Sequence, residues 1–195
     1  MKILAFVDLH GNKKAMRDIE KKAKSADVVV CAGDISIFEN DLPDILRSLN
    51  KLNKTVIIIP GNHEDEKDLQ MLSKRYSHIK DVHNRAYRIE NYLFLGYGGG
   101  GFSTVDRDFE KLGKKFMKVM KDRKVILVTH APAYKTKLDD IDGNSCGNKS
   151  ITNFIKKAKP ELVISGHLHE NAGKEDKIGK TRLVNPGPYG KIIII

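Results

Sequence analysis

The sequence has few cysteines and no long apolar run, and both absences limit what the protein can be. Cys31 and Cys146 are the only cysteines, and they form neither a CxxC pair nor a disulfide framework. We therefore expect a reducing, cytoplasmic setting. The longest apolar runs have the length of a strand, far below the roughly 20 residues of a membrane-spanning helix. We expect no membrane partner, and we expect the short run from Ile3 to Val7 to be the first strand and not a signal-peptide core.

The sequence also lacks linkers and internal repeats. Charged residues make up 31% and apolar residues 40% of the chain, which is a globular balance, and no Pro-rich or Gly/Ser-rich tract interrupts it. At 195 residues, the chain is long enough to bury a core of its own. We expect a single domain over residues 1–195.

Acidic residues are in the minority, with 25 Asp and Glu against 35 Lys and Arg and a net charge of +10. Such an excess is typical of proteins with anionic partners such as nucleic acids. Many of the lysines, however, lie opposite apolar residues on one expected helix, which indicates an ordinary solvated face. The lysines are Lys111, Lys114, Lys115, Lys118 and Lys121, and the apolar residues are Phe109, Leu112, Phe116 and Met120. We therefore do not favour the nucleic-acid partner that the charge alone would allow, and the pattern indicates no oligomeric state.

Apolar, β-branched runs alternate with segments of helical period along the chain. The expected strands are residues 3–7, 28–32, 56–59, 93–95, 125–128 and 162–164, and the expected helices are residues 13–24, 42–50, 66–75, 106–121 and 150–159. Two further short strands, "TRLV" and "KIIII", are expected to close a sheet at the C-terminus. This alternation predicts an α/β fold, and the near-continuous apolar strands imply cover on both faces.

Polar side chains that can bind metals follow five of these strands. In open α/β sheets, ligands bind beyond the carboxyl ends of the strands, so these positions are the candidate site. They carry Asp8 and His10, then Asp34, then Asn62 and His63, then His130, and finally His167 and His169.

Each of these residues alone has an ordinary structural explanation. A lone histidine beside a strand is usually a hydrogen-bonded core or loop residue. Asp8 could cap the helix that follows Gly11, and Asp34 could close a turn. Five strand ends of this kind together are hard to produce by capping alone, so we interpret the set as one functional site.

Carboxylate, amide and imidazole ligands without a thiolate suit divalent manganese, iron, nickel, zinc or cobalt, of which we expect manganese first. Two aspartates, one asparagine and four or five histidines are more ligands than one ion can use, so we expect two ions that share one bridging carboxylate. The four positive charges of the ions would exceed the negative charges of Asp8, Asp34 and a bridging hydroxide, and the neutral Asn62 preserves that excess. An anion such as a phosphate ester would bind there, and metals lower the pKa of bound water to about 7. Phosphoryl hydrolysis follows from this combination.

The complete set resembles the five motifs of the calcineurin-like metallophosphoesterases. The motifs are Asp8-x-His10, Gly33-Asp34, Gly61-Asn62-His63-Glu64, Thr129-His130 and Gly166-His167-x-His169, in this order. The resemblance implies a four-layer αββα sandwich with a dimetal site at its strand ends. The tail, with "GHLHENAG" and Asn185-Pro186-Gly187, looks like the small stand-alone bacterial and archaeal phosphoesterases.

The resemblance also implies a role for each motif residue. One metal would be held by Asp8, His10 and His169, the other by Asn62, His130 and His167, and Asp34 would bridge both. His63 would be the catalytic residue that contacts the phosphate and stabilises or protonates the leaving group, while the bridging hydroxide attacks phosphorus in line. Glu64 has no ligand role in that pattern, and we expect it to support the ligands from behind.

The second motif departs from the family pattern in a way that narrows the range of possible substrates. The Ser/Thr protein phosphatases continue the second motif as Gly-Asp-x-x-Asp-Arg-Gly, whereas Phe38 stands here at the place of the phosphate-gripping arginine. This argues against a phosphoprotein substrate. We expect a phosphodiesterase that hydrolyses a small or nucleotide-like phosphoester. The alternatives are a nuclease acting on DNA or RNA and a non-catalytic metal-binding scaffold of the same fold.

Two loops add expectations of their own. Residues 96–101 read "GYGGGG" and formally match GxGxxG, but the next strand ends in Thr129-His130 and not in the acidic residue of a dinucleotide site. We expect these glycines to let the loop pass close to the metal cleft, with Tyr97 and Phe102 shaping its wall. The polar residues 134–148 are a candidate substrate-facing loop, with disorder as the alternative.

Overall fold

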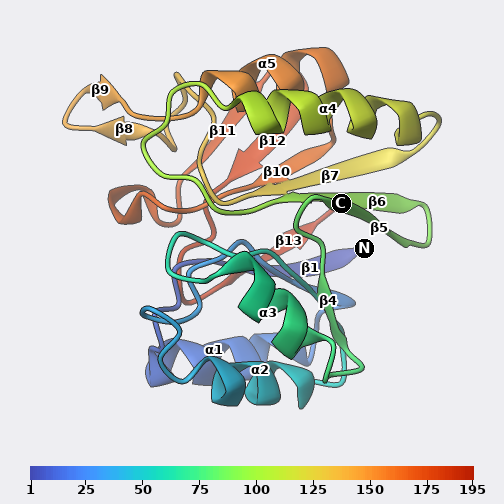
Figure 1. Cartoon of the computed structure of the whole chain (residues 1–195), viewed down its shortest axis with the longest axis vertical. Helices are drawn as coiled ribbons and strands as arrows, with labels where there is room; N and C mark the ends of the chain where they lie inside the picture. Colours follow the sequence, from blue (N-terminus) through green and yellow to red (C-terminus); the bar gives the residue numbers. More distant parts are fainter.

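The computed structural model describes all 195 residues as two β-sheets that pack face to face between two layers of helices (Figure 1). The first sheet has the order β13-β1-β2-β3-β4. Its strands are β1 (Lys2–Phe6), β2 (Val28–Cys31), β3 (Thr55–Ile58), β4 (Ile79–Asp81) and β13 (Lys191–Ile194). The strands β1 to β4 run parallel, and β13 pairs with β1 in the antiparallel direction.

The second sheet has the order β11-β12-β10-β7-β6-β5. Its strands are β5 (Arg85–Ile89), β6 (Tyr92–Tyr97), β7 (Lys124–Thr129), β10 (Leu162–Ile164), β11 (Glu175–Ile178) and β12 (Thr181–Val184). The four central strands are parallel, and both edge strands are antiparallel to their neighbours. A separate hairpin, β8 (Asp140–Ile141) with β9 (Asn144–Ser145), projects beside it.

Helices cover the outer face of each sheet. The helices α1 (Lys13–Ala23), α2 (Leu42–Asn50) and α3 (Glu66–Ser73) lie on the first sheet, and α4 (Arg107–Val119) and α5 (Lys149–Ala158) lie on the second (Figure 1). A single 3₁₀ turn, η1 (His169–Asn171), follows β10. The expected four-layer αββα sandwich is therefore confirmed. None of the helices is both long and apolar enough to cross a membrane.

The layers arise from the period of two along each strand. In β1, Leu4 and Phe6 point into the cluster beneath α1 and α2, while Ile3 and Ala5, followed by Val7, point into the cluster between the two sheets. Because successive side chains alternate between faces, an unbroken apolar run must be buried on both sides. The same alternation on β7 sends Ile126 to the middle layer. The expected solvated face of α4 is confirmed, since its lysines are exposed over a buried Phe109 and Phe116.

The structure corrects the expected strand set in two ways. The strands β4, β5 and β11 were not predicted, because β5 and β11 are sheet edges with polar sequences, RAYRI and EDKI, and β4 has only three residues. The two C-terminal strands do not close one sheet together. The "TRLV" strand, β12, joins the second sheet, whereas β13 joins the first. Cys31 and Cys146 are both free thiols, as expected.

Candidate metal centre

All seven predicted ligands converge at the carboxyl ends of the parallel strands. Three groups of side chains bring potential ligand atoms within 4.8 Å of one another: Asp8, His10 and His169; His10, Asp34 and His63; and Asp8, Asp34 and His130. Asn62 and His167 join the cluster through hydrogen bonds described below. Residues that are far apart in the sequence thus surround one small volume between the two sheets.

The first part of the cluster contains Asp8, His10 and His169. His10 Nδ1 donates to the carbonyl oxygen of Ser36 at 3.3 Å, which fixes its tautomer and directs Nε2 into the site. His10 Nε2 then lies 3.1 Å from His169 Nε2. Asp8 is buried, and this burial raises the pKa of its carboxyl above the usual value against the opposing effect of His130 and His169.

The second part contains Asn62, His130 and His167. Asn62 Oδ1 lies 3.0 Å from His130 Nε2 and 2.9 Å from His167 Nδ1. His130 is fully buried, and its Nδ1 donates to the carbonyl oxygen of Ala32 at 2.9 Å. Burial lowers the pKa of His167 to about 4, with a further contribution from the positive charge of His130. His167 is therefore a neutral imidazole at pH 7, which is the form that binds metals.

Asp34 lies between the two parts. Its Oδ2 is 3.3 Å from His130 Nε2 and 3.9 Å from His10 Nε2, and its Oδ1 accepts from the backbone N–H of His63 at 3.0 Å. Burial alone would raise the pKa of Asp34, but the hydrogen bond and charge of His130 outweigh it and lower the pKa to about 2. The carboxylate is therefore ionised across the physiological range.

The acceptor groups around His130 need a proton or a metal ion among them. When Nδ1 donates to Ala32, a neutral His130 presents a lone pair at Nε2, yet its neighbours Asn62 Oδ1 and Asp34 Oδ2 are also acceptors. Three acceptors at 3.0 to 3.3 Å repel one another unless a proton or a metal ion lies among them. Ligands bound to one ion at about 2.1 Å lie about 3.0 to 3.4 Å apart. Buried His167 Nε2 and His63 Nδ1 also lack hydrogen-bond partners. These residues fit a metal centre.

The capping explanation for Asp8 is wrong. The helix α1 is capped by Asn12, whose side chain accepts from the backbone N–H groups of Lys14 and Ala15, so Asp8 is free for another role. Four residues of the cluster also have a left-handed backbone, which non-glycine residues rarely adopt. They are Asp8 (φ 55°), His10 (φ 46°), Asp34 (φ 53°) and His167 (φ 71°).

His63 lies at the edge of this cluster. Its ring packs edge-on against His10 with a centroid distance of 4.9 Å, and one of its ring nitrogens lies within 4.8 Å of ligand atoms of His10 and Asp34. Its Nδ1 is buried without a hydrogen-bond partner. His63 is therefore close enough to reach a group bound between the two parts of the cluster.

Glu64 organises the loops that carry the ligands. Its buried carboxylate accepts from the backbone N–H groups of Asp34 and Gly61 at 2.9 Å each, and from the backbone N–H and hydroxyl of Ser36 at 3.0 and 2.7 Å. It thus ties the loop after β2 to the loop after β3. These bonds agree with the expected supporting position of Glu64. Its motif alone does not indicate that it joins two loops.

Replacing Glu64 with alanine is expected to lower the free energy of unfolding by about 3 kcal/mol, because four buried donors lose their acceptor. Urea denaturation followed by circular dichroism measures this change. The control is Glu161→Ala, which removes an exposed carboxylate whose ion pair with Lys124 spans 3.9 Å and is expected to change stability by less than about 0.5 kcal/mol. Equal urea midpoints for the two variants would contradict this role of Glu64.

Glycines allow the close approach of these loops. A Cβ at Gly61 would lie 1.9 Å from Asp34 Oδ1, so only glycine fits beside that carboxylate. The loop of residues 96–101 passes close to the site in the same way. A Cβ at Gly98 would lie 2.2 Å from the carbonyl oxygen of Pro60, and the backbone N–H of Gly99 donates to that oxygen at 2.9 Å. The expected close passage of this loop agrees with these contacts.

Tyr97 and His83 have roles that the sequence did not indicate. The hydroxyl of Tyr97 donates to Asp106 at 2.6 Å, and its ring packs against Phe109, so it holds the start of α4 and does not belong to the metal cluster. His83 is buried against Tyr97 and accepts from the backbone N–H of Gly98 at 2.9 Å. No sequence motif marks His83, because its contacts depend on the position of the glycine loop.

Residues 134–148 contain the short β8–β9 hairpin and are joined to the rest of the chain by hydrogen bonds. Asp139 is fully buried and accepts from the backbone N–H groups of Lys135, Thr136 and Gly147. The side chain of Asn171 donates to the carbonyl oxygens of Leu138 and Asp140, which fastens the hairpin to the turn that begins at His169.

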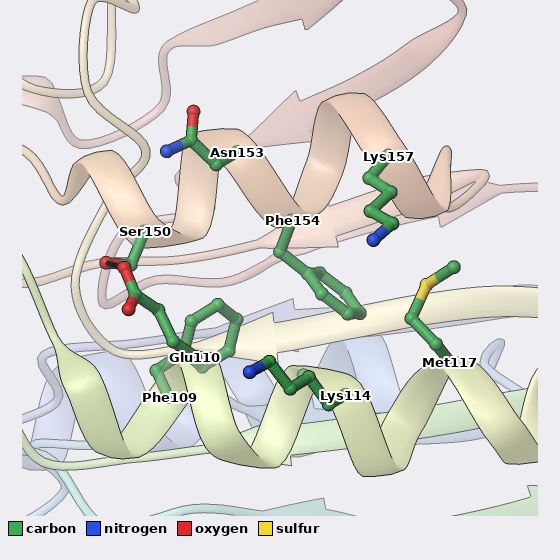
Figure 2. Close-up of a pocket in the computed structure, with 9 residues that line it drawn as sticks. Phe109, Glu110, Lys114, Met117, Ser150, Asn153, Phe154 and Lys157 are labelled. Carbon is green, nitrogen blue, oxygen red and sulfur yellow. Dashed lines mark hydrogen bonds between the residues drawn. The ribbon is translucent and has the colours of Figure 1, made fainter.

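A cavity of about 420 Å³ lies elsewhere, between α4 and α5 (Figure 2). Phe109, Phe154 and Met117 contribute its apolar surface, and Lys114 and Lys157 lie at its rim. None of its lining residues belongs to the metal-ligand cluster. The chemistry of the strand ends therefore identifies the functional site, and the size of a cavity does not.

Comparisons with known proteins agree with this geometry. The model of the calcineurin-like phosphoesterase family matches residues 1–171. The uncharacterized protein MJ1162 of Methanocaldococcus jannaschii is 33% identical over 201 residues, covering 96% of this chain and 88% of that protein. The crystal structure of TT1561 of Thermus thermophilus aligns with a TM-score of 0.80 at 20% identity, covering 95% and 88% of the two chains. A dimetal phosphatase of Danio rerio aligns with a TM-score of 0.68 at 12% identity, covering 94% and 86%. At these identities, the two structures show a shared fold.

Proposed function

The chain belongs to the calcineurin-like phosphoesterase family, and from this premise we propose that it is a two-metal phosphodiesterase acting on small or nucleotide-like phosphoesters. As a member of this family, the chain is a hydrolase of phosphoester bonds that depends on divalent metal ions. The observation that carries the proposal is the cluster of carboxylate, amide and imidazole groups around Asp34, whose spacing fits divalent cations at the strand ends.

We propose that the seven ligands hold two ions in two sets. Asp8, His10 and His169 would hold one ion, Asn62, His130 and His167 would hold the other, and Asp34 would be shared between them. Manganese is our first expectation, because oxygen and imidazole ligands without thiolates suit it as well as iron, nickel, zinc or cobalt. When bound, such ions polarise a phosphoryl oxygen and lower the pKa of water, which supplies the nucleophile.

The residues of the chain contribute orientation and proton transfer. Ser36 and Ala32 hold the rings of His10 and His130 by accepting from their Nδ1 atoms, so both Nε2 atoms face the phosphate site. We propose that His63 donates a proton to the leaving oxygen. Its unpartnered Nδ1 and its place beside His10 support this role.

The charges around the site favour a diester over a monoester. A monoester dianion carries more charge than a diester monoanion, and enzymes that bind it commonly add a bidentate arginine. Here no lysine or arginine makes a hydrogen bond or ion pair to any of the seven ligands or to His63. Phe38 also stands where protein phosphatases have their arginine.

The proposal also covers the domain organisation and the cellular location of the protein. We propose that residues 1–195 act as one domain, supported by the shared apolar layer between the two sheets. We also propose a cytoplasmic location, supported by the two free thiols.

Metal-reconstituted protein is expected to hydrolyse bis(p-nitrophenyl) phosphate at least roughly tenfold better in kcat/KM than p-nitrophenyl phosphate, because no lysine or arginine is bonded among the ligands and His63 to receive the second negative charge. The assay compares manganese, iron, nickel, zinc and cobalt, and chelation should reduce turnover to background. Absence of turnover with every metal would favour the scaffold alternative. Cleavage of polynucleotides that falls steeply with salt would favour a nuclease.

A further inference from the structure

Two exposed phenylalanines pack against histidines of the candidate metal centre. Phe38 lies in the loop after β2, and its ring is 4.6 Å from the ring of His63 between centroids. Phe102 lies in the loop after β6, and its ring is 4.9 Å from that of His167. Their exposed fractions are 75% and 66%, the two largest among the exposed aromatic residues of the chain.

Both rings lie on loops that are held in place. Beside Phe38, the carboxylate of Glu39 accepts from the backbone N–H of Asp65 at 2.9 Å, which ties this loop to the one carrying His63. Beside Phe102, the carbonyl oxygen of Ser103 accepts from the side chain of Asn148 at 2.9 Å. The exposure of the rings is therefore a property of the fold.

The backbone of Phe38 adds a second observation. Its φ is 46°, in the left-handed region that a bulky residue rarely adopts. Strain of this kind usually persists at sites with a function. Burial does not explain it, because the ring remains largely exposed.

We propose that Phe38 and Phe102 bind a planar aromatic group of the substrate, the nucleobase of a nucleotide ester, next to the phosphorus atom. This inference rests on the proposed function, since the phosphate must lie among the histidines that the two rings touch. A group joined to phosphorus through one ester oxygen or through a ribose lies close to such rings. Aromatic side chains stack on nucleobases with little sequence preference, so the site selects for planarity more than for a particular base.

Two esters with the same leaving group test this inference. The wild type with manganese is expected to cleave the p-nitrophenyl ester of thymidine 5′-phosphate roughly tenfold better in kcat/KM than methyl p-nitrophenyl phosphate. Phe38→Leu and Phe102→Leu should each reduce this ratio several-fold, whereas Phe38→Tyr should retain it because the ring remains. Met117→Ala is the control, since it removes an exposed apolar side chain in the α4–α5 cavity (Figure 2).

Calorimetric binding of thymidine 5′-monophosphate and methyl phosphate to the metal-loaded protein provides a readout without turnover. Tighter binding of the nucleotide that weakens in both leucine variants supports the inference. Equal ratios in the wild type and the leucine variants, or equal binding of the two phosphates, would overturn it while leaving the phosphodiesterase proposal intact. If neither ester is cleaved, the proposed function fails, and the binding comparison still decides whether the two rings hold an aromatic group.

Discussion

Replacing Asp34 with asparagine is expected to lower kcat/KM by about a thousandfold and to reduce the bound metal from two ions per chain to one or none. The asparagine keeps the shape of the side chain and the acceptor for the backbone N–H of His63, but it removes the negative charge beside His130 and His10. Losing about 4 kcal/mol of electrostatic stabilisation corresponds to about three powers of ten in rate. Elemental analysis of reconstituted protein measures the metal content separately from activity.

The control for this variant is Asp44→Asn, the same substitution at an exposed residue of α2 whose carboxylate pairs with Arg47. It should retain both ions and full activity, because surface ion pairs contribute little. An Asp34→Asn protein that kept two ions and the activity of the wild type would show that Asp34 is not the bridging ligand.

The convergence of the candidate ligands could be predicted from sequence because parallel strands all end at the same edge of a sheet. Once residues 3–7 and 28–32 are interpreted as strands, Asp8 and Asp34 must lie side by side, whatever the loops do. What could not be predicted depends on contacts between loops. Glu64 joins the turns after β2 and β3 through four hydrogen bonds, whereas its motif predicts only a supporting position and none of these contacts.

The edge strands were missed for a different physical reason. None of the residues of β5 is fully buried, and its sequence RAYRI alternates weakly, so its pairing with β6 is visible only in the folded sheet. Phe38 shows the same limit at the site. Its sequence position indicates only that an arginine is absent, whereas the fold places its ring against His63.

Replacing His63 with alanine is expected to lower kcat by about 10² to 10⁴-fold, as is typical for the loss of a general acid, while the protein retains two ions. The reason is that His63 delivers a proton to the leaving oxygen and is not needed to hold the metals. The loss should therefore be larger for a diester with a methoxide-like leaving group than for one that releases p-nitrophenolate, which departs without a proton. Kinetics with the two kinds of ester, together with elemental analysis, measure both parts of the prediction.

The matched control is His78→Ala, because His78 precedes β4 and lies outside the metal-ligand groups. It should leave rate and metal content unchanged. Two outcomes would change the assignment of His63. If His63→Ala lost an ion, His63 would be a ligand, which its distance to His10 and Asp34 permits. If both leaving groups suffered the same loss, His63 would act by positioning the phosphate, because a proton donor must matter most where the leaving oxygen is most basic.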